Sequence, residues 1–443
     1  MASDDEGPKF NRRGRLGRFM KLGGMAASVT GSAMAERLTR AWRPEEAREE
    51  ALRATMVGNA QKMVRAMGEL KGAAMKVGQM LSVVPDQVPE EVRQELAALQ
   101  KDTPPMSYEL VAAQFEAGTG TPLRDAFAYF DPEPIGAASI GQVHRARTFE
   151  GTEVAVKVQY PGILDTLDSD LKNLGILIQT GRMLADKERL DAFMAEIRRG
   201  ILEEADYAHE AENLETFGER FSAFEGVVVP RVVRDFTSDT VLTMGYLEGE
   251  KLDQAIEKLD QPARDEACLR FARLVIWSFH EQQMLHADPH PGNFLHMPDG
   301  RLGLLDFGCV RTYDPKFTDG WLKVIVAKWR HEKDHLRELF DELGYAPMKG
   351  SKGLTNQQLH ELTDITTAPF LYDREFDWGA WKPRPALEAF AKANLAVLQY
   401  ASPPEAIFYF RVSAGVWGLL TRAGVKANFH RIAREVAERR GLL

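Results

Sequence analysis

The stretch "HADPHPGNFLHMPDGRLGLLDFG", residues 286–308, carries three polar side chains whose spacing decides the interpretation of the whole chain. Asp288 and Asn293 lie five residues apart, and Asp306 follows an apolar run that is typical of a strand. A carboxylate can accept or orient a proton. Mg²⁺ needs only a few protein oxygens when phosphate oxygens complete its coordination. We therefore predict that Asp288 accepts or orients a proton and that Asn293 and Asp306 bind a metal ion.

The same spacing occurs in the signature of protein kinases, where His-x-Asp precedes an Asn by five residues and Asp-Phe-Gly follows. A structural loop without a metal would explain the His and Pro residues of this stretch, but it would not explain the joint spacing. The pattern therefore predicts a Mg²⁺ site for a nucleotide, with Asp288 as the catalytic carboxylate and with Asn293 and Asp306 as metal ligands.

A nucleotide also needs a phosphate-binding turn, which "IGAASIGQVHRA" at residues 135–146 can provide. Gly136, Ala138, Gly141 and Val143 match the kinase pattern G-x-G-x-x-G-x-V with Ala in place of the middle Gly. Fourteen residues after Val143, "VAVK" places Lys157 at the end of an apolar strand. An unpaired ammonium is costly in such a place, and binding to nucleotide phosphates would resolve that cost.

Lys157 needs a carboxylate partner, and the stretch "ILEEADYAHEAENLETF" offers several. If this stretch is one continuous helix, Glu203, Asp206 and Glu210 share a face, and Glu204 lies about 100° away. A solvated helix face would explain the same charges. Periodicity alone leaves the partner of Lys157 open.

The composition excludes several classes of protein. The chain has 443 residues and a net charge of −9, which argues against a nucleic-acid-binding protein. Two cysteines are too few for a disulfide framework and indicate a reducing compartment. Neither apolar stretch, 22–35 or 412–421, reaches the ~20 residues that span a bilayer. The acidic start is unlike a signal peptide. We expect a cytoplasmic protein, and the sequence sets no oligomeric state.

Four segments follow from the chain's patterning: a basic arm at 1–50, a helical extension at 51–106, an ATP-binding core at 107–330 and a helical region at 331–443. Residues 9–43 carry nine Lys or Arg and one acid. This excess fits a segment lying on an anionic membrane surface, and it fits a solvated arm equally well.

The pattern departs from ordinary protein kinases. The glycine-rich turn contains Ala137, Ala138 and Ser139, and Pro289-His290 replaces the usual Leu-Lys after the catalytic Asp. No Ala-Pro-Glu follows Asp-Phe-Gly. The extension carries "LKGAAMKVGQMLS", in which Lys76 and Gln79 belong to a K-x-G-Q motif. Together these features resemble the UbiB/ADCK atypical kinases over residues 55–420.

The resemblance implies an α+β, two-lobed protein-kinase-like fold with a helical N-terminal extension carrying K-x-G-Q and a helical C-terminal region. It implies that Lys157 contacts the phosphates of ATP or ADP and pairs with Glu210, and that Asn293 and Asp306 bind Mg²⁺. It also implies that Lys76 and Gln79 fold over the site, with Glu204 and Asp206 helping to hold them.

The same resemblance implies a Mg²⁺-dependent ATPase or atypical kinase that supports ubiquinone biosynthesis or the handling of membrane isoprenoid lipids. Its expected partners are a nucleotide, a membrane lipid or quinone precursor, and a membrane surface. Two other functions stay open, a phosphotransferase acting on a small molecule or protein and a non-catalytic scaffold gated by nucleotide.

Overall fold

The computed structural model describes residues 105–138, 140–163, 198–199, 202–203, 205–332, 334–348, 353–394, 396–397 and 400–443. Residues 105–212 and 231–246 form one compact unit, and residues 213–230 and 247–443 form a second. The predicted basic arm and nearly all of the helical extension lie outside the described residues. The same holds for four predicted site residues, which are Lys76, Gln79, Ser139 and Glu204.

The first unit is built on a five-stranded antiparallel sheet with the order β1-β3-β4-β6, in which β2 also pairs with β3. β3 and β4 form a hairpin around Gly151, as the alternation of apolar and polar residues on both sides of this glycine predicts. Gly151 has a φ of +84°, a conformation that a glycine adopts without steric cost. The strands are β1 (Tyr129–Phe130), β2 (Gly136–Ala138), β3 (Gly141–Arg147), β4 (Glu153–Gln159) and β6 (Val241–Gly245).

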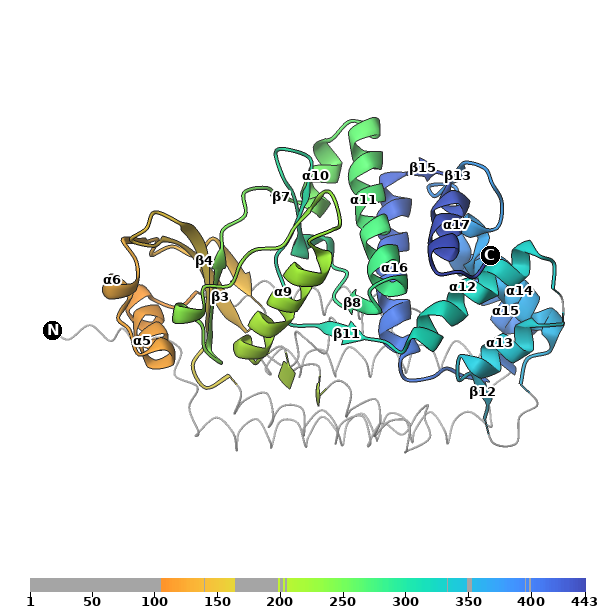
Figure 1. Ribbon diagram of the computed structural model, residues 1–443, viewed down its shortest axis with the longest axis horizontal. Helices are drawn as coiled ribbons and strands as arrows, with labels where there is room; N and C mark the ends of the chain where they lie inside the picture. The colour runs from red at the N-terminus through yellow and green to blue at the C-terminus, as the bar shows by residue number, and fades with distance from the viewer. Residues whose placement is uncertain are drawn as a thin grey trace, which may run out of the picture. The chain divides into compact units, whose positions relative to one another are not determined.

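One face of this sheet is covered by α5 (Tyr108–Thr119), which is followed by the short α6 (Leu123–Ala126) (Figure 1). Val154, Val156 and Val158 of β4 belong to the same buried cluster as Val111 and Phe115 of α5. Side chains alternate along a strand, so Lys157 lies on the opposite face of β4. The short η2 (Arg234–Phe236) precedes β6 in this unit.

The second unit contains a small sheet with the order β5-β10-β9-β7 and a two-stranded pairing of β8 with β11. β9 and β10 lie within the predicted catalytic stretch, residues 286–308, and β8 and β11 lie at its two ends. The strands of the two sheets are β5 (Val227–Val228), β7 (Glu250–Lys251), β8 (Met284–His286), β9 (Phe294–His296), β10 (Leu302–Leu304) and β11 (Val310–Thr312), with η3 (Pro291–Asn293) between β8 and β9.

Helices make up most of the remainder of the second unit, including residues 331–443, for which the patterning predicts a helical region. They are α10 (Leu252–Lys258), α11 (Gln261–His280), α12 (Pro315–Trp329), α13 (Leu336–Glu342), α14 (Asn356–Thr366), η4 (Ala368–Phe370), α15 (Pro383–Ala393), α16 (Ala406–Ala423) and α17 (Phe429–Arg439). Two short ribbons were not predicted, because pairs of two residues carry no readable period: β12 (Ala346–Pro347) with β14 (Tyr400–Ala401), and β13 (Phe376–Asp377) with β15 (Lys426–Ala427).

The centre of the second unit is aromatic. α11 and α16 lie side by side (Figure 1). The ring of Tyr409 on α16 stacks on Phe279 of α11, with centroids 4.6 Å apart, and on Trp321 of α12, with centroids 5.1 Å apart. Burial raises the pKa of the Tyr409 hydroxyl. This packing fixes α16 against two other helices.

Candidate functional site

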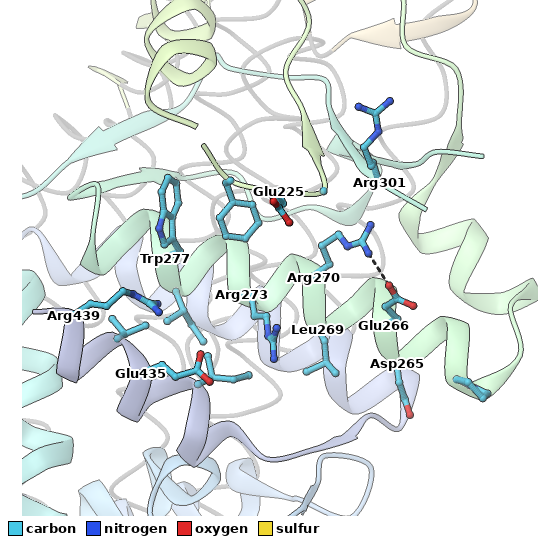
Figure 2. A pocket seen from close by; sticks show the side chains of 16 residues that line it. Glu225, Asp265, Glu266, Leu269, Arg270, Arg273, Trp277, Arg301, Glu435 and Arg439 are labelled. Carbon is cyan, nitrogen blue, oxygen red and sulfur yellow. Dashed lines mark hydrogen bonds and ion pairs between the residues drawn. The ribbon is translucent and has the colours of Figure 1, made fainter. Parts of the chain in front are cut away.

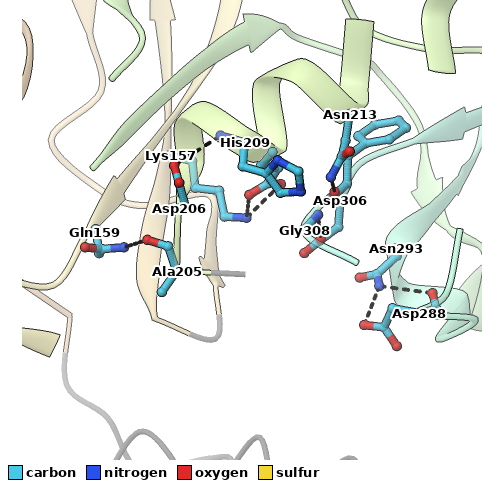
Figure 3. Close-up of polar contacts among 12 residues, drawn as sticks. Lys157, Gln159, Ala205, Asp206, His209, Asn213, Asp288, Asn293, Asp306 and Gly308 are labelled. Carbon is cyan, nitrogen blue, oxygen red and sulfur yellow. Dashed lines mark hydrogen bonds and ion pairs between the residues drawn. The ribbon is translucent and has the colours of Figure 1, made fainter. Parts of the chain in front are cut away.

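Lys157 and Glu210 form a buried ion pair in the first unit. The Lys157 ammonium donates to both Glu210 carboxylate oxygens, at 2.9 Å and 2.7 Å (Figure 3). Lys157 is 4% exposed and Glu210 is fully buried. Glu210 lies in the first turn of α9 (Tyr207–Phe221), where the helix dipole favours a negative charge. The Lys157 ammonium also lies 4.7 Å from the centre of the Tyr207 ring. These contacts hold the ammonium in one place.

The premise of one continuous helix through Glu203, Asp206 and Glu210 is wrong. Asp206 lies ahead of α9, and its Oδ1 accepts hydrogen bonds from the backbone N–H groups of Ala208 and His209, each at 3.1 Å. An aspartate that satisfies the free N–H groups of a first turn begins a helix. Asp206 therefore has a capping role in the described structure, and its contact with the K-x-G-Q motif stays a prediction.

The glycine-rich turn connects β2 to β3, which pair in the register Gly136 with Val143 and Ala138 with Gly141. Ala137 lies between them, opposite Gln142. A Cβ on Gly141 would overlap the Val158 carbonyl oxygen, so close packing of β3 on β4 already requires glycine there. A Cβ on Gly136 would meet no atom of the described residues within 4 Å. Close packing thus explains the glycine at position 141 by itself, and phosphate binding by this turn stays a prediction.

The predicted catalytic carboxylate lies between β8 and η3 in the second unit. One oxygen of Asp288, Oδ2, accepts from the Asn293 amide nitrogen at 3.0 Å (Figure 3). Because the nitrogen is used in this way, the Asn293 Oδ1 is the atom that can ligate a cation. His286, the first residue of the quoted stretch, contacts the backbone oxygen of Asp306 through its Nε2.

The β9–β10 hairpin brings the two predicted metal ligands to one end of the small sheet. Phe294 pairs with Leu304, and the N–H of Leu305 donates to the Asn293 carbonyl oxygen at 3.0 Å. Asn293 and Asp306 therefore flank the same end of the hairpin. The Asp306 Oδ1 accepts from the Gly308 N–H at 3.0 Å, which orients this carboxylate. An amide oxygen and a carboxylate are ligands that suit Mg²⁺.

The Asp-Phe-Gly segment is also held by α9. The side-chain amide of Asn213 donates to the Phe307 carbonyl oxygen at 3.0 Å (Figure 3). Asn213 lies on the same helix as Glu210, one turn further along. The backbone at Asp306 is thus held by contacts from three places, α9, His286 and the β9–β10 hairpin.

Sequence reasoning missed one residue of this site, Arg411. Its Nη2 donates to the Asp288 Oδ1 at 2.8 Å, and the residue is 9% exposed. A signal for it existed. Arg411 is the single charged residue in the apolar run from Ala406 to Thr421, and a charge in such a run needs a buried partner. The partner is 123 residues away in sequence, so no local pattern identifies it.

A groove of about 870 Å³ lies elsewhere in the second unit, between α11 and α17 (Figure 2). None of the predicted site residues lines it. Acidic and basic side chains alternate along its walls, including Glu266 beside Arg270, and a charge run of mixed sign is most often a solvated surface. The groove is therefore not the expected nucleotide site.

Two other features bear on the site. Among the described residues, no group of three or more His, Cys, Asp or Glu side chains is arranged to hold a metal. Within the described part of the chain, every helix is too short or too polar to cross a bilayer.

Gly415 of α16 offers a test of the packing against the Asp288 loop. A Cβ at this position would lie 2.7 Å from the Pro289 Cγ, whereas a Cβ on Gly418 of the same helix would meet no described atom within 4 Å. We expect Gly415→Ala to destabilise the protein by about 1–3 kcal/mol through overpacking. We expect Gly418→Ala to stabilise it by about 0.5–1 kcal/mol, because alanine favours a helix. Thermal unfolding of the two variants measures the difference, and equal midpoints would contradict this packing.

Comparisons with known proteins agree with the sequence and the fold. The ABC1 atypical kinase-like domain matches residues 98–340, more than half of the chain. The mitochondrial atypical kinase coq-8 of Caenorhabditis elegans is 33% identical over 75% of this chain and 45% of its own length. The mitochondrial atypical kinase COQ8 of Schizosaccharomyces pombe is 29% identical over 93% of this chain and 67% of its own length. This chain thus spans less than half of the nematode relative.

A solved structure has the same fold. The complex of Rv3197 with erythromycin from Mycobacterium tuberculosis aligns with a TM-score of 0.63 and 27% identity, over 88% of this chain and 98% of that chain. The predicted protein-kinase-like fold with mixed helices and sheets is confirmed. The chain therefore belongs to the ABC1 family of atypical kinases, as its resemblance to the UbiB/ADCK atypical kinases predicted.

Proposed function

We propose that this protein binds ATP with Mg²⁺ and hydrolyses it, in support of ubiquinone biosynthesis or the handling of membrane isoprenoid lipids. The observation that carries the proposal is that Asn293, whose amide donates to Asp288, and Asp306 flank the same end of the β9–β10 hairpin in the second unit. Membership of an atypical kinase family supports it. The names of the relatives support kinase chemistry, and the lipid connection rests on the resemblance of the sequence motifs.

The residues of the chain have distinct roles in this proposal. Lys157, oriented by Glu210, binds nucleotide phosphates, and the backbone between Gly136 and Gly141 approaches them. Asn293 and Asp306 bind the Mg²⁺ ion, which neutralises charge on the phosphates. Asp288 orients the attacking water and accepts its proton as the bond from the γ-phosphorus to the bridging oxygen breaks.

The predicted roles of the N-terminal segments complete the proposal. Lys76 and Gln79 of the K-x-G-Q motif cover the site, with Glu204 and Asp206 holding them. The basic residues of 9–43 bind an anionic membrane surface. The localisation that follows is cytoplasmic or peripheral on a membrane. Lys76, Gln79, Glu204 and the basic arm lie outside the described residues, so these roles rest on the sequence alone.

The experiment follows the γ-phosphate of labelled ATP with Mg²⁺, with and without anionic liposomes that carry a quinone-like phenol. We expect inorganic phosphate to be released, and to be released faster with the liposomes. Label found on a protein or a small molecule would replace the ATPase by a phosphotransferase. Nucleotide binding without any turnover would replace it by a nucleotide-gated scaffold.

A further inference from the structure

One face of α16 contacts the catalytic loop at three consecutive residues. Phe408 belongs to a buried cluster with Ala287, Arg411 is paired with Asp288, and Gly415 packs against Pro289. Positions 408, 411 and 415 are spaced by three and four residues, so they lie on one side of the helix. These three residues therefore form a continuous stripe along α16, and they meet Ala287, Asp288 and Pro289 in that order.

The middle contact of this stripe is an ion pair. The Asp288 carboxylate receives a hydrogen bond on each oxygen, from Arg411 at 2.8 Å and from Asn293 at 3.0 Å. An arginine that is nine-tenths buried requires such a partner, because an isolated buried charge is costly. The Arg411 Nε is buried and has no hydrogen-bond partner among the described residues. Asp288 therefore does not use all of the hydrogen-bonding capacity of this guanidinium.

The helix that carries Arg411 is rigidly placed. Tyr409 stacks on α11 and α12, and Phe408 contacts Cys309, which follows Asp-Phe-Gly directly. The Arg311 guanidinium lies 4.6 Å from the centre of the Phe408 ring. The same helix therefore touches the residue before Asp288 and the residue after Asp-Phe-Gly. Arg411 is held in register with both segments.

The loop itself lacks a cation at the expected place, because Pro289-His290 replaces the Leu-Lys of protein kinases. We propose that Arg411 supplies the missing cation from α16, as the positioning residue that holds Asp288 in its orientation. The inference rests on the proposed function, because it assigns Arg411 a part in ATP turnover. It makes the helical C-terminal region a part of the catalytic machinery.

The test uses the full chain and three variants, Arg411→Met, Arg411→Lys and the control Arg422→Met. Arg422 lies on the last turn of the same helix, where it is exposed. We expect Arg411→Met to lower the rate of phosphate release by about 10- to 100-fold, the usual effect of removing a group that orients a functional side chain. Binding of the Mg²⁺–nucleotide complex is not weakened in Arg411→Met, Arg411→Lys recovers part of the rate, and Arg422→Met behaves as the wild type.

A second readout does not need turnover. Removing the guanidinium leaves the charge of Asp288 uncompensated beside the metal ligand Asn293, so a cation is attracted more strongly. The Mg²⁺ concentration that half-saturates nucleotide binding should be severalfold lower in Arg411→Met and unchanged in Arg411→Lys and Arg422→Met. A role of Arg411 in stability alone would weaken nucleotide binding and lower the thermal midpoint without this shift.

The outcomes separate the inference from the proposed function. A wild-type rate in Arg411→Met, or a parallel loss of rate, affinity and thermal midpoint, overturns the role of Arg411. A wild-type protein that binds Mg²⁺–nucleotide without hydrolysing it contradicts the proposed hydrolysis. In that case the Mg²⁺ shift alone tests the positioning role of Arg411. A shift supports this role, and the absence of a shift contradicts it. A wild-type protein that binds no nucleotide contradicts both.

Discussion

Replacing Asp306 with Asn is expected to lower Mg²⁺-dependent phosphate release from ATP by about 100- to 1000-fold, the range found when one electrostatic contact to a transition state is lost. The substitution keeps the shape of the side chain and removes its charge. The Gly308 N–H still has an oxygen to donate to, so the turn of Asp-Phe-Gly is expected to persist. What disappears is the proposed anionic ligand of the Mg²⁺ ion, which would neutralise the charge of the phosphates.

The control for this prediction is Asp299→Asn. Asp299 lies in the turn between β9 and β10, where it accepts hydrogen bonds from the N–H and the guanidinium of Arg301. It is in the same hairpin and carries the same charge, but it lies at the opposite end from Asn293 and Asp306. We expect a wild-type rate from this variant. Equal rates for Asp306→Asn and the wild type would remove Asp306 from the chemistry.

The second large effect is on stability. Glu210→Gln is expected to destabilise the first unit by about 3–5 kcal/mol, because it leaves the buried Lys157 ammonium without a counter-charge. The amide can still accept a hydrogen bond, so the loss measures charge rather than shape. Native-state hydrogen exchange of the β4 amides in the full chain reports this change, because it measures the opening of that sheet.

Two variants make the stability prediction specific. Glu438→Gln breaks an ion pair between exposed side chains, Arg434 and Glu438 of α17, and should leave hydrogen exchange unchanged. The double variant Lys157→Met/Glu210→Leu replaces both charges by apolar groups and should restore most of the lost stability. A double variant as unstable as Glu210→Gln would show that packing, and not the unpaired charge, is responsible. Loss of nucleotide binding is expected in the double variant whatever its stability.

Much of the fold was predictable from local patterns. The hairpin around Gly151 follows from alternation and a glycine, and the helices beyond Asp314 follow from their periodicity. The start of α9 was not predicted correctly. One continuous helix would place Asp206 in its interior, but aspartate also caps helices, and the structure contains the cap. In a helix interior the Asp206 side chain would not accept hydrogen bonds from the backbone N–H groups that follow it, whereas in a cap it does. Periodicity does not distinguish these two cases.

The candidate site also has one part that local sequence patterns predict and another part that they do not. The spacing of Asp288, Asn293 and Asp306 is a local property, because one loop and one hairpin carry all three residues. The sequence by itself therefore determined the family, and it predicted which residues of the loop bind the metal ion. The partner of Lys157 lies 53 residues away and that of Asp288 lies 123 residues away. From the residues alone Glu210 was one of several carboxylates, and only the resemblance to a family pointed to it.

The resemblance to a family did not point to Arg411. Its position in an apolar run showed that it needs a partner, but any buried carboxylate of the chain could have met that need. Only the tertiary structure decided that the partner is Asp288, because the packing of α16 on α11, α12 and the catalytic loop sets which side chains meet. Ion pairs between distant segments depend on how helices pack, and helix packing depends on the shapes of many side chains at once.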